Sequence, residues 1–244
     1  MLQNAERSIK NNLRALLDKG KISDEEKSRI YKKLLFTDDI QSCIADVFIE
    51  AIIEQEDQKI ALFNQLAEIN HSQSIFCSNT SSLSLEHIGS RIQNPSRFIG
   101  MHFFNPPVIM KLVEVVSTSF TNNETIKKIQ ELARQMNKIS VLCKDSPGFI
   151  VNRVARPYYI ESLRLVEDDC TDFEALDSIM EASGFKMGPF KLMDLIGNDV
   201  NYAVSCSVYQ QLNLPKRLKP SYIQQQKVLR GELGRKSTKG YYSY

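Results

Sequence analysis

Between residues 47 and 143, short apolar runs alternate with stretches in which apolar side chains recur every three or four positions. The short runs predict strands at residues 47–53, 74–78, 98–104, 112–116 and 140–143. The helical spacing predicts helices around residues 60–66, 85–88 and 126–132. Such alternation predicts an α/β fold, with a mostly parallel, doubly wound sheet of the Rossmann-like kind.

Capping signals add helices before this region and mark a helix start within it. Residues 9–17 show helical spacing, and Ser23 with Glu26 forms a capping box that opens the next helix. The stretch Thr121-Asn-Asn-Glu124 predicts a further capping box with Thr121 as the N-cap. The chain therefore opens on helices rather than on the strand that usually begins such a domain.

After residue 144 the pattern becomes helical. Ser146 is the predicted N-cap and Pro147 the first residue of a long helix, which Pro157 should kink. Further helix starts are predicted at Asp172 and Pro189. The sequence thus predicts an α/β domain, residues 1–145, followed by an all-helical domain, residues 146–244.

The composition is that of a globular protein and points to neither a nucleic-acid nor a membrane partner. Of the 244 residues, 42% are hydrophobic and 25% charged, and 31 basic against 29 acidic residues give a net charge of +2. No apolar run reaches the length of a membrane span. Five scattered cysteines without a C-x-x-C pair favour reduced thiols in the cytoplasm. Three histidines with no neighbouring cysteines predict no metal site.

One titratable side chain lies on each of two neighbouring predicted strands. His102 interrupts the apolar run 98–104, and Glu114 lies in the run 112–116. The turn at Asn105-Pro106-Pro107 can bring the two side chains together, and a carboxylate would then hold one tautomer of the imidazole for use as a general base. The alternative is that His102 is a core histidine bonded to a backbone carbonyl, with Glu114 a surface charge.

Seven segments, in order along the chain, together resemble the 3-hydroxyacyl-CoA dehydrogenase family of the L-3-hydroxybutyryl-CoA type. They are Glu50-Ala-Ile-Ile-Glu54, Ser78-Asn-Thr-Ser-Ser-Leu83, Gly100-Met-His-Phe-Phe-Asn-Pro106, Lys111-Leu-Val-Glu-Val115, Asp145-Ser-Pro-Gly-Phe-Ile-Val-Asn-Arg153, Met187-Gly-Pro-Phe-Lys-Leu-Met-Asp194 and Gly234-Arg-Lys-Ser-Thr-Lys-Gly-Tyr-Tyr242. Related sugar-acid dehydrogenases share the fold but usually replace the two phenylalanines after the histidine, so they rank second.

The resemblance implies four catalytic residues. His102 would take the proton of the substrate's 3-hydroxyl, and Glu114 would orient the imidazole. Ser81 and Asn152 would bind the substrate at its reacting oxygen. Taken alone, Ser81 could belong to a simple turn, and Asn152 could be an exposed polar residue.

The resemblance also implies binding residues for an NAD or NADP cofactor and for an acyl-CoA substrate. Glu54, Lys59, Asn105 and Lys236 would contact the dinucleotide, and Lys19 would lie near the CoA phosphates. Taken alone, Glu54 and Lys59 could be an ordinary surface pair, and Lys236 a solvated charge. The implied reaction interconverts L-3-hydroxyacyl-CoA and 3-oxoacyl-CoA in fatty acid or butyrate metabolism, and the implied assembly is a homodimer formed by the helical domain.

The glycine pattern departs from the family. None of the ten glycines forms a G-x-G pair, whereas a dinucleotide's pyrophosphate is normally held at a Gly-rich turn after the first strand. We therefore expect an N-terminally truncated α/β domain that lacks the adenosine half of the cofactor site. The alternative function is a non-catalytic remnant that binds acyl-CoA or a partner chain.

Overall fold

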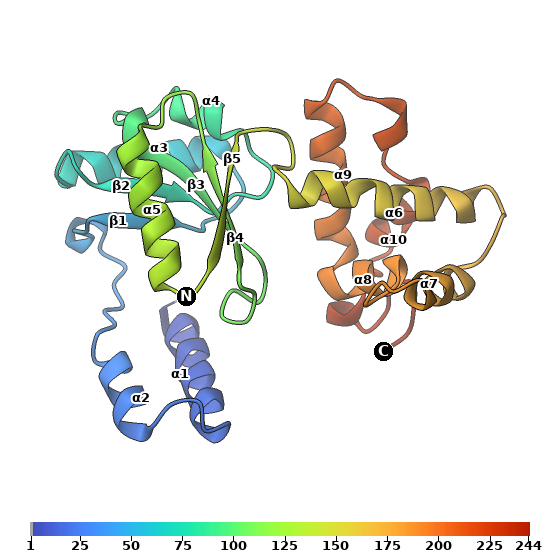
Figure 1. Cartoon of the computed structure of the whole chain (residues 1–244), viewed down its shortest axis with the longest axis horizontal. Helices are drawn as coiled ribbons and strands as arrows, with labels where there is room; N and C mark the ends of the chain where they lie inside the picture. The colour runs from blue at the N-terminus through green and yellow to red at the C-terminus, as the bar shows by residue number, and fades with distance from the viewer. Residues whose placement is uncertain (1) are drawn as a thin grey trace.

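The structure, a computed structural model, describes residues 2–244. In chain order its elements are α1 (Leu2–Asp18), α2 (Asp24–Tyr31), η1 (Ile40–Ser42), β1 (Val47–Glu50), α3 (Glu56–Ile69), β2 (Ile75–Ser78), α4 (Leu85–Gly89), η2 (Pro95–Arg97), β3 (Phe98–Phe103), β4 (Leu112–Ser117), α5 (Asn123–Gln135), β5 (Ile139–Lys144), α6 (Val151–Glu167), α7 (Phe173–Ala182), α8 (Pro189–Ile196), α9 (Asn198–Gln211), η3 (Lys216–Leu218), α10 (Tyr222–Leu229) and η4 (Arg235–Ser237). An α/β unit and a helical unit lie side by side (Figure 1).

The five strands form one mixed sheet in the order β1-β2-β3-β4-β5. β1, β2 and β3 run parallel, β4 is antiparallel to β3, and β5 is parallel to β4. The predicted mostly parallel α/β fold followed by helices is thereby confirmed. Because β1, β2 and β3 are parallel, the loops that follow them lie at the same edge of the sheet.

Helices cover both faces of this sheet. Phe63 of α3 and Leu85 of α4 are buried on one face, and Ile129 of α5 is buried on the other. Consecutive residues of β2 point to opposite faces, so Phe76 packs toward α3 and Cys77 toward α5. Figure 1 shows α5 in front of the sheet and α3 behind it.

The first strand is shorter than the run 47–53 predicted. β1 ends at Glu50, whose Oε1 accepts a hydrogen bond from the Ile52 N–H at 2.6 Å. This bond turns the chain out of the strand, and both Ile52 and Ile53 are exposed. The interpretation of residues 51–53 as buried strand is therefore wrong. An apolar run does not reveal where a side chain will accept a hydrogen bond from the backbone and end the strand.

Two of the predicted helix starts agree with the structure and one is displaced. Asp172 is the N-cap of α7, and Pro189 is the first residue of α8. The N-cap of α5 is Asn122, whose side chain accepts a hydrogen bond from the Thr125 N–H at 2.8 Å. Thr121 is therefore not the cap, since the asparagine next to it competes for the same role.

The long helix of the helical unit also begins later than predicted. α6 starts at Val151, not at Pro147. Gly148 and Phe149 have φ angles of 75° and 49°, outside the right-handed helical region. A tertiary contact with the α/β unit, described below, fixes this start, so local capping signals could not predict it.

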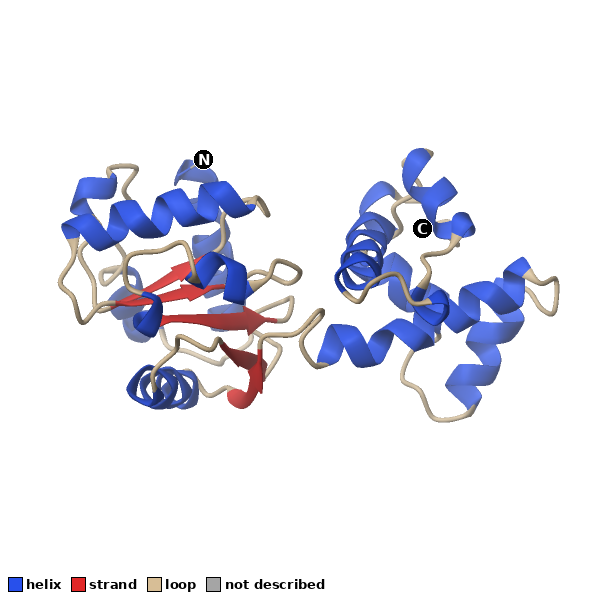
Figure 2. Cartoon of the chain, turned by 90° about the horizontal axis from the view of Figure 1, so that it is seen from above, coloured by secondary structure: helices blue, strands red, loops and turns tan. Residues whose placement is uncertain are grey.

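The helical unit, shown from a second direction in Figure 2, has its own hydrophobic core. Leu163 of α6, Leu176 of α7 and Phe190 of α8 are buried together. The C-terminal tail closes over this core, with Tyr241 in ring contact with Phe190 at 4.9 Å between centroids. No helix within residues 2–244 combines the length and apolar character needed to cross a membrane.

Asp194 of α8 fastens the C-terminal tail from inside this core. Its buried carboxylate accepts hydrogen bonds from the N–H groups of Tyr241 and Tyr242, both at 3.0 Å, and from Asn198 Nδ2 at 2.9 Å. Gly240 permits this close approach, since a Cβ there would lie 1.9 Å from Asp194 Oδ1. The tail therefore depends on one buried acceptor.

The N-terminal helices α1 and α2 form a pair that projects from the α/β unit (Figure 1). The Tyr31 hydroxyl donates to the Glu6 carboxylate and joins the two helices. The capping box predicted at Ser23 and Glu26 is confirmed, with hydrogen bonds in both directions.

Asp194→Ala should destabilise the helical unit. Removing the carboxylate leaves the buried N–H groups of Tyr241 and Tyr242 without an acceptor, so we expect a loss of roughly 3–5 kcal/mol in the free energy of unfolding. Urea denaturation measures it. As a control, Glu131→Ala removes an exposed ion pair with Arg134 and should leave the unfolding midpoint in place. Equal midpoints for both variants would contradict the role of Asp194.

Candidate active site

The register of β3 and β4 brings the predicted histidine and carboxylate together. His102 lies opposite Glu114 in the antiparallel pair, and its Nδ1 is 2.7 Å from Glu114 Oε2. The two side chains are only 7% and 1% exposed. The predicted contact is confirmed, and the alternative of Glu114 as a surface charge is wrong.

The second oxygen of the same carboxylate binds the start of α6. Glu114 Oε1 accepts hydrogen bonds from the N–H groups of Ile150 and Val151, both at 2.9 Å. Burial alone would raise the pKa of Glu114, but the hydrogen bonds from His102, Val151 and Ile150 outweigh burial and hold that pKa below its usual value. Glu114 is therefore an ionised acceptor at neutral pH.

This arrangement determines which nitrogen of His102 is free. An ionised carboxylate accepts only, so Nδ1 carries the proton of the neutral ring and Nε2 carries the lone pair. The rings of Phe104 and Phe149 flank the imidazole, with centroids 4.7 and 5.6 Å away. Within residues 2–244 Nε2 makes no hydrogen bond, so it can accept a proton from a bound molecule.

The predicted Ser81 lies in the loop after β2, where a neighbouring carboxylate organises the backbone. Glu54 Oε1 accepts hydrogen bonds from the Ser81 N–H at 3.1 Å, the Ser82 hydroxyl at 3.0 Å and the Thr80 hydroxyl. Burial would raise the pKa of Glu54, but the Thr80 hydrogen bond and the charge of Lys59 lower it below its usual value. Three consecutive residues of the loop therefore donate hydrogen bonds to one carboxylate oxygen.

Lys59 is buried inside the protein and is not part of an ordinary surface ion pair. Its side chain is 1% exposed, and its Nζ lies 2.6 Å from Glu50 Oε1 and 3.2 Å from Glu54 Oε2. The Ser78 hydroxyl donates to the other Glu50 oxygen at 2.7 Å. The Lys59 amine is thus enclosed and paired with two carboxylates, and its contact with a dinucleotide stays a prediction.

Asn152 follows Val151 in the first turn of α6, so the contact of Glu114 with that turn brings it to the dyad. Its backbone carbonyl accepts a hydrogen bond from Arg156 Nε at 2.9 Å, and Arg156 NH1 reaches the Asn201 carbonyl at 3.0 Å. Burial lowers the pKa of Arg156 to about 10. The Asn152 turn is thus held from α9 as well.

Three predicted binding residues lie apart from this cluster. Asn105 is exposed in the turn after β3, and Lys19 is exposed just beyond α1. Lys236 belongs to the helical unit, where its Nζ pairs with Asp199 Oδ2 at 2.7 Å. Within residues 2–244 no hydrogen bond or ion pair joins these three side chains to His102.

The sequence reading missed two residues that organise the site. Glu50 holds Lys59, as described, and Asn79 Oδ1 accepts a hydrogen bond from the Phe103 N–H at 2.8 Å, which joins the β2 loop to β3. A carboxylate inside an apolar strand run was an available signal for Glu50. For Asn79 there was no signal beyond its place after a strand.

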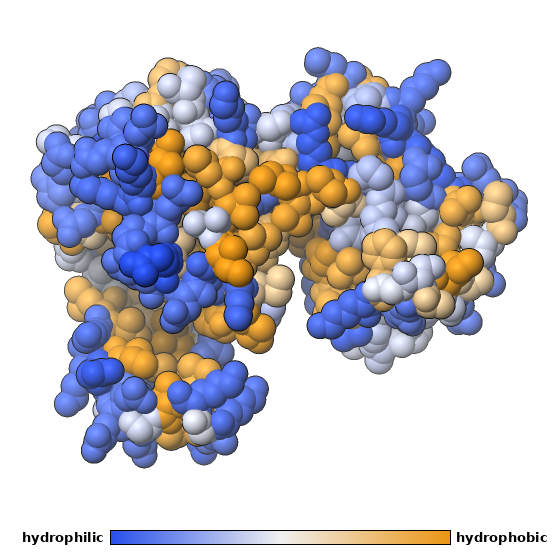
Figure 3. Space-filling model, viewed as in Figure 1, coloured by the Kyte–Doolittle hydropathy of each residue, from blue (hydrophilic) through white to orange (hydrophobic). Residues whose placement is uncertain are grey.

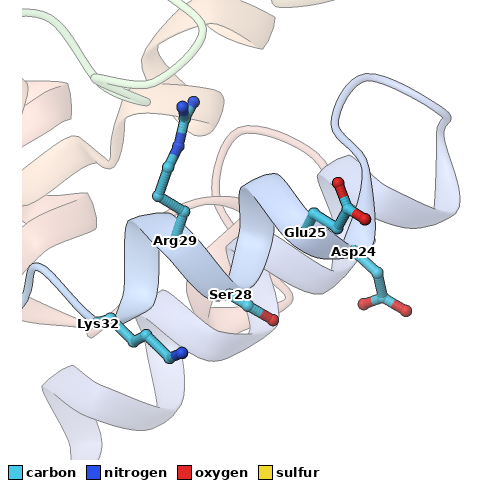
Figure 4. A pocket seen from close by; sticks show the side chains of 5 residues that line it. All are labelled: Asp24, Glu25, Ser28, Arg29 and Lys32. Atoms are coloured by element: carbon cyan, nitrogen blue, oxygen red, sulfur yellow. The ribbon is translucent and has the colours of Figure 1, made fainter.

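A hollow elsewhere on the described surface has no such chemistry. It lies on α2 and is lined by Asp24, Glu25, Ser28, Arg29 and Lys32. Figure 4 shows these side chains spread along one helix without converging on a point. Among residues 2–244, no group of three or more His, Cys, Asp or Glu side chains could hold a metal ion.

Comparison with known proteins places this geometry in a family. The model of the 3-hydroxyacyl-CoA dehydrogenase NAD-binding domain matches residues 1–146, and that of the C-terminal domain matches residues 148–244. The chain belongs to the 3-hydroxyacyl-CoA dehydrogenase family. The resemblance read from the seven segments is thereby confirmed.

Similar proteins agree in sequence and in fold. A 3-hydroxyadipyl-CoA dehydrogenase of Escherichia coli K12 is 44% identical over 95% of this chain, which spans 49% of that relative's length. A probable 3-hydroxybutyryl-CoA dehydrogenase of Deinococcus radiodurans is 37% identical over 97% of the chain and 85% of its own length. A crystal structure of 3-hydroxybutyryl-CoA dehydrogenase from E. coli, 44% identical, superposes with a TM-score of 0.95 over 99% of this chain and 52% of its own.

Glu114→Gln should make the stability of the protein less sensitive to acid. The folded pKa of Glu114 lies below its ordinary value of 4.5, so its ionised form stabilises the fold above that pH. This contribution is lost as the pH falls from 4.5 through the folded pKa. The free energy of unfolding should therefore fall less steeply in the variant, measured by urea denaturation between about pH 6 and about pH 3.

The matched control for this acid series is Glu68→Gln. Glu68 is exposed on α3 and makes no ion pair within residues 2–244. Its variant should follow the wild-type pH dependence. Parallel curves for wild type and Glu114→Gln would show that Glu114 is not held ionised by the fold.

Proposed function

We propose that this chain carries the proton-transfer and substrate-orienting residues of an NAD(P)-dependent interconversion of L-3-hydroxyacyl-CoA and 3-oxoacyl-CoA. The buried His102–Glu114 pair, with one imidazole nitrogen free, is the observation that carries the proposal. The names of the relatives support the substrate class, since one is a probable 3-hydroxybutyryl-CoA dehydrogenase and another a 3-hydroxyadipyl-CoA dehydrogenase. Fatty acid and butyrate metabolism supply substrates of this kind.

In the oxidation, His102 Nε2 accepts the proton of the substrate's 3-hydroxyl. A nicotinamide cofactor, when bound, would supply the redox chemistry at C3. The imidazolium that forms is stabilised by the ionised Glu114, which contacts Nδ1 at 2.7 Å. In the reverse direction His102 returns the proton to the oxygen of the 3-oxo group.

Ser81 and Asn152 would orient that oxygen from opposite units. Ser81 follows β2 in the α/β unit, whereas Asn152 lies in the first turn of α6. A hydroxyl and an amide donate directional hydrogen bonds without adding charge beside His102. We infer that the substrate binds where these two side chains and Nε2 converge.

The turn before α3 fits the ribose end of a nicotinamide cofactor better than its pyrophosphate. The Glu54 side chain is 38% exposed, and its ionised carboxylate can accept hydrogen bonds from ribose hydroxyls. The first turn of α3 carries Glu56 and Asp57, whose charges oppose a phosphate at that N-terminus. Asn105 and Lys236 are the other proposed cofactor contacts. Since the sequence holds no G-x-G pair, we infer that residues 1–244 do not supply the adenosine half of the site.

Lys19 is proposed to contact the phosphates of the CoA moiety. It is exposed just after α1, in the helix pair that projects from the α/β unit (Figure 1). An exposed lysine is a suitable point charge for a phosphate.

We further propose a cytoplasmic homodimer formed by the helical unit. Ile179, Leu229 and Val154 are exposed there, which supports burial against a second copy. Apolar side chains also gather over β5, where Val141 and Leu142 are exposed (Figure 3). Five free cysteines fit a reducing compartment. Sedimentation as a compact monomer at micromolar concentration would contradict the dimer.

His102→Gln should reduce kcat for acetoacetyl-CoA reduction by roughly 10²–10⁴-fold, the range for losing a positioned acid–base group. Glu114→Gln should lower kcat with little change in KM, because its partner is His102 and not the substrate. Turnover is measured in a fusion that places a strand–helix unit with a G-x-G-x-x-G turn before residue 1. His71→Gln, at an exposed histidine, is the control. Near-native turnover of His102→Gln would exclude it as the general base.

Residues 1–244 alone should bind NADH only in the millimolar range or worse, a binding free energy no better than about −4 kcal/mol. Acetoacetyl-CoA reduction should then be near background, because hydride transfer depends on an oriented cofactor. Acetoacetyl-CoA should still bind, since Ser81, His102 and Asn152 are present. Calorimetry with each ligand measures both affinities. Micromolar NADH binding with turnover would overturn the inference about the adenosine half, and absence of acetoacetyl-CoA binding would count against the substrate class.

A further inference from the structure

The loop of residues 79–83, which carries Ser81, is supported by a chain of three buried or half-buried charges. Glu50 Oε1 contacts Lys59 Nζ at 2.6 Å, and the same Nζ contacts Glu54 Oε2 at 3.2 Å. The other Glu54 oxygen binds the loop. The charges therefore run from the end of β1, through α3, to the backbone at Ser81.

Of the three linked charges, Glu54 is the one that binds the loop directly. Its Oε1 accepts hydrogen bonds from Thr80, Ser81 and Ser82, of which the Ser81 bond comes from the backbone N–H. An acceptor of this kind needs its negative charge, because three donors converge on one oxygen. Lys59 is the cation that contacts Glu54 among residues 2–244.

Glu50 determines where Lys59 can be. Both side chains are 1% exposed, and Glu50 is itself held by the Ser78 hydroxyl at 2.7 Å and the Ile52 N–H at 2.6 Å. These two anchors belong to the strand β2 and to the turn after β1. The Lys59 ammonium is therefore held between Glu50 and Glu54.

The helical unit holds the same loop from its other side. The Ser82 carbonyl accepts hydrogen bonds from Ser207 Oγ at 3.0 Å and from Gln211 Nε2 at 2.7 Å, both on α9. The Ser81 hydroxyl lies between the contacts with Glu54 and those with α9. It makes no hydrogen bond within residues 2–244. The loop thus presents one uncommitted hydroxyl on a backbone held at both neighbours.

We propose that Glu50 and Lys59 are positioning residues that fix Glu54 and, through it, hold the Ser81 hydroxyl where the substrate's reacting oxygen binds. The proposal rests on the proposed function for the role of Ser81, whereas the support of the loop stands on the contacts alone. It assigns a role in the site to Glu50, a buried residue whose carboxylate contacts only Lys59, Ser78 and Ile52 within residues 2–244.

Hydrogen–deuterium exchange tests the support of the loop without requiring turnover. In Glu50→Gln/Lys59→Met both charges are replaced at similar volume, so the fold survives better than with one charge left unpaired. Peptides covering residues 79–83 should exchange at least about 10-fold faster than in wild type, while peptides of β3 and β4 keep their wild-type rates. Unchanged exchange in the loop, or equal acceleration in loop and strands, would overturn the proposal.

A matched control removes an ion pair elsewhere. Glu181 and Lys191, 2.9 Å apart, lie in the helical unit, and Glu181→Gln/Lys191→Met should leave exchange in residues 79–83 unchanged. Accelerated exchange in this control would mean that the loop responds to general loss of stability, which would also overturn the proposal.

Calorimetry with acetoacetyl-CoA tests the link to Ser81. The charge-removing double variant and Ser81→Ala should weaken binding by similar factors, and combining them should add no further loss. Losses that multiply would show that Glu50 and Lys59 act independently of Ser81, against the proposal. If wild type binds no acetoacetyl-CoA, the proposed function fails, and the exchange experiment still decides whether these two residues hold the loop.

Discussion

The site and the connection between the two units both depend on the carboxylate of Glu114. One oxygen holds His102 in the sheet, and the other accepts the first N–H groups of α6, at Ile150 and Val151. A helix N-terminus carries partial positive charge and unpaired N–H groups, so an ionised carboxylate satisfies both needs. The orientation of the imidazole and the start of the helical unit are therefore set by the same group.

Two other carboxylates of the site also bind donors from several elements. Glu54 gathers the donors of the Ser81 loop, and Glu50 gathers Lys59, Ser78 and the turn after β1. The charges of Glu114 and Glu50 are removed from water and that of Glu54 partly so, which is costly unless several donors replace the lost hydration. Because the donors come from neighbouring loops, satisfying each charge also fixes the loops at the carboxyl edge of the sheet.

The consequence for the proposed function is that the side chains assigned to it are arranged by contacts between elements rather than by any one element. His102 comes from β3, Ser81 from the loop after β2 and Asn152 from α6. The α9 helix reaches both sides, through Gln211 to the Ser82 carbonyl and through Asn201 to Arg156 beside Asn152. Movement between the units would change the positions of all three side chains together.

The sequence by itself determined the α/β alternation, the helical second half and the family. It offered the pairing of His102 with Glu114 as one of two interpretations. These features follow from local periodicity, from ordered motifs and from a short turn between adjacent strands. Only the tertiary structure decided that β1 ends at Glu50, that Lys59 is enclosed and that α6 begins at Val151. Glu114 and Ile150, for example, are 36 positions apart. Periodicity reports which face of an element is buried, whereas the partner of a buried charge depends on how distant elements pack, and that information is not local.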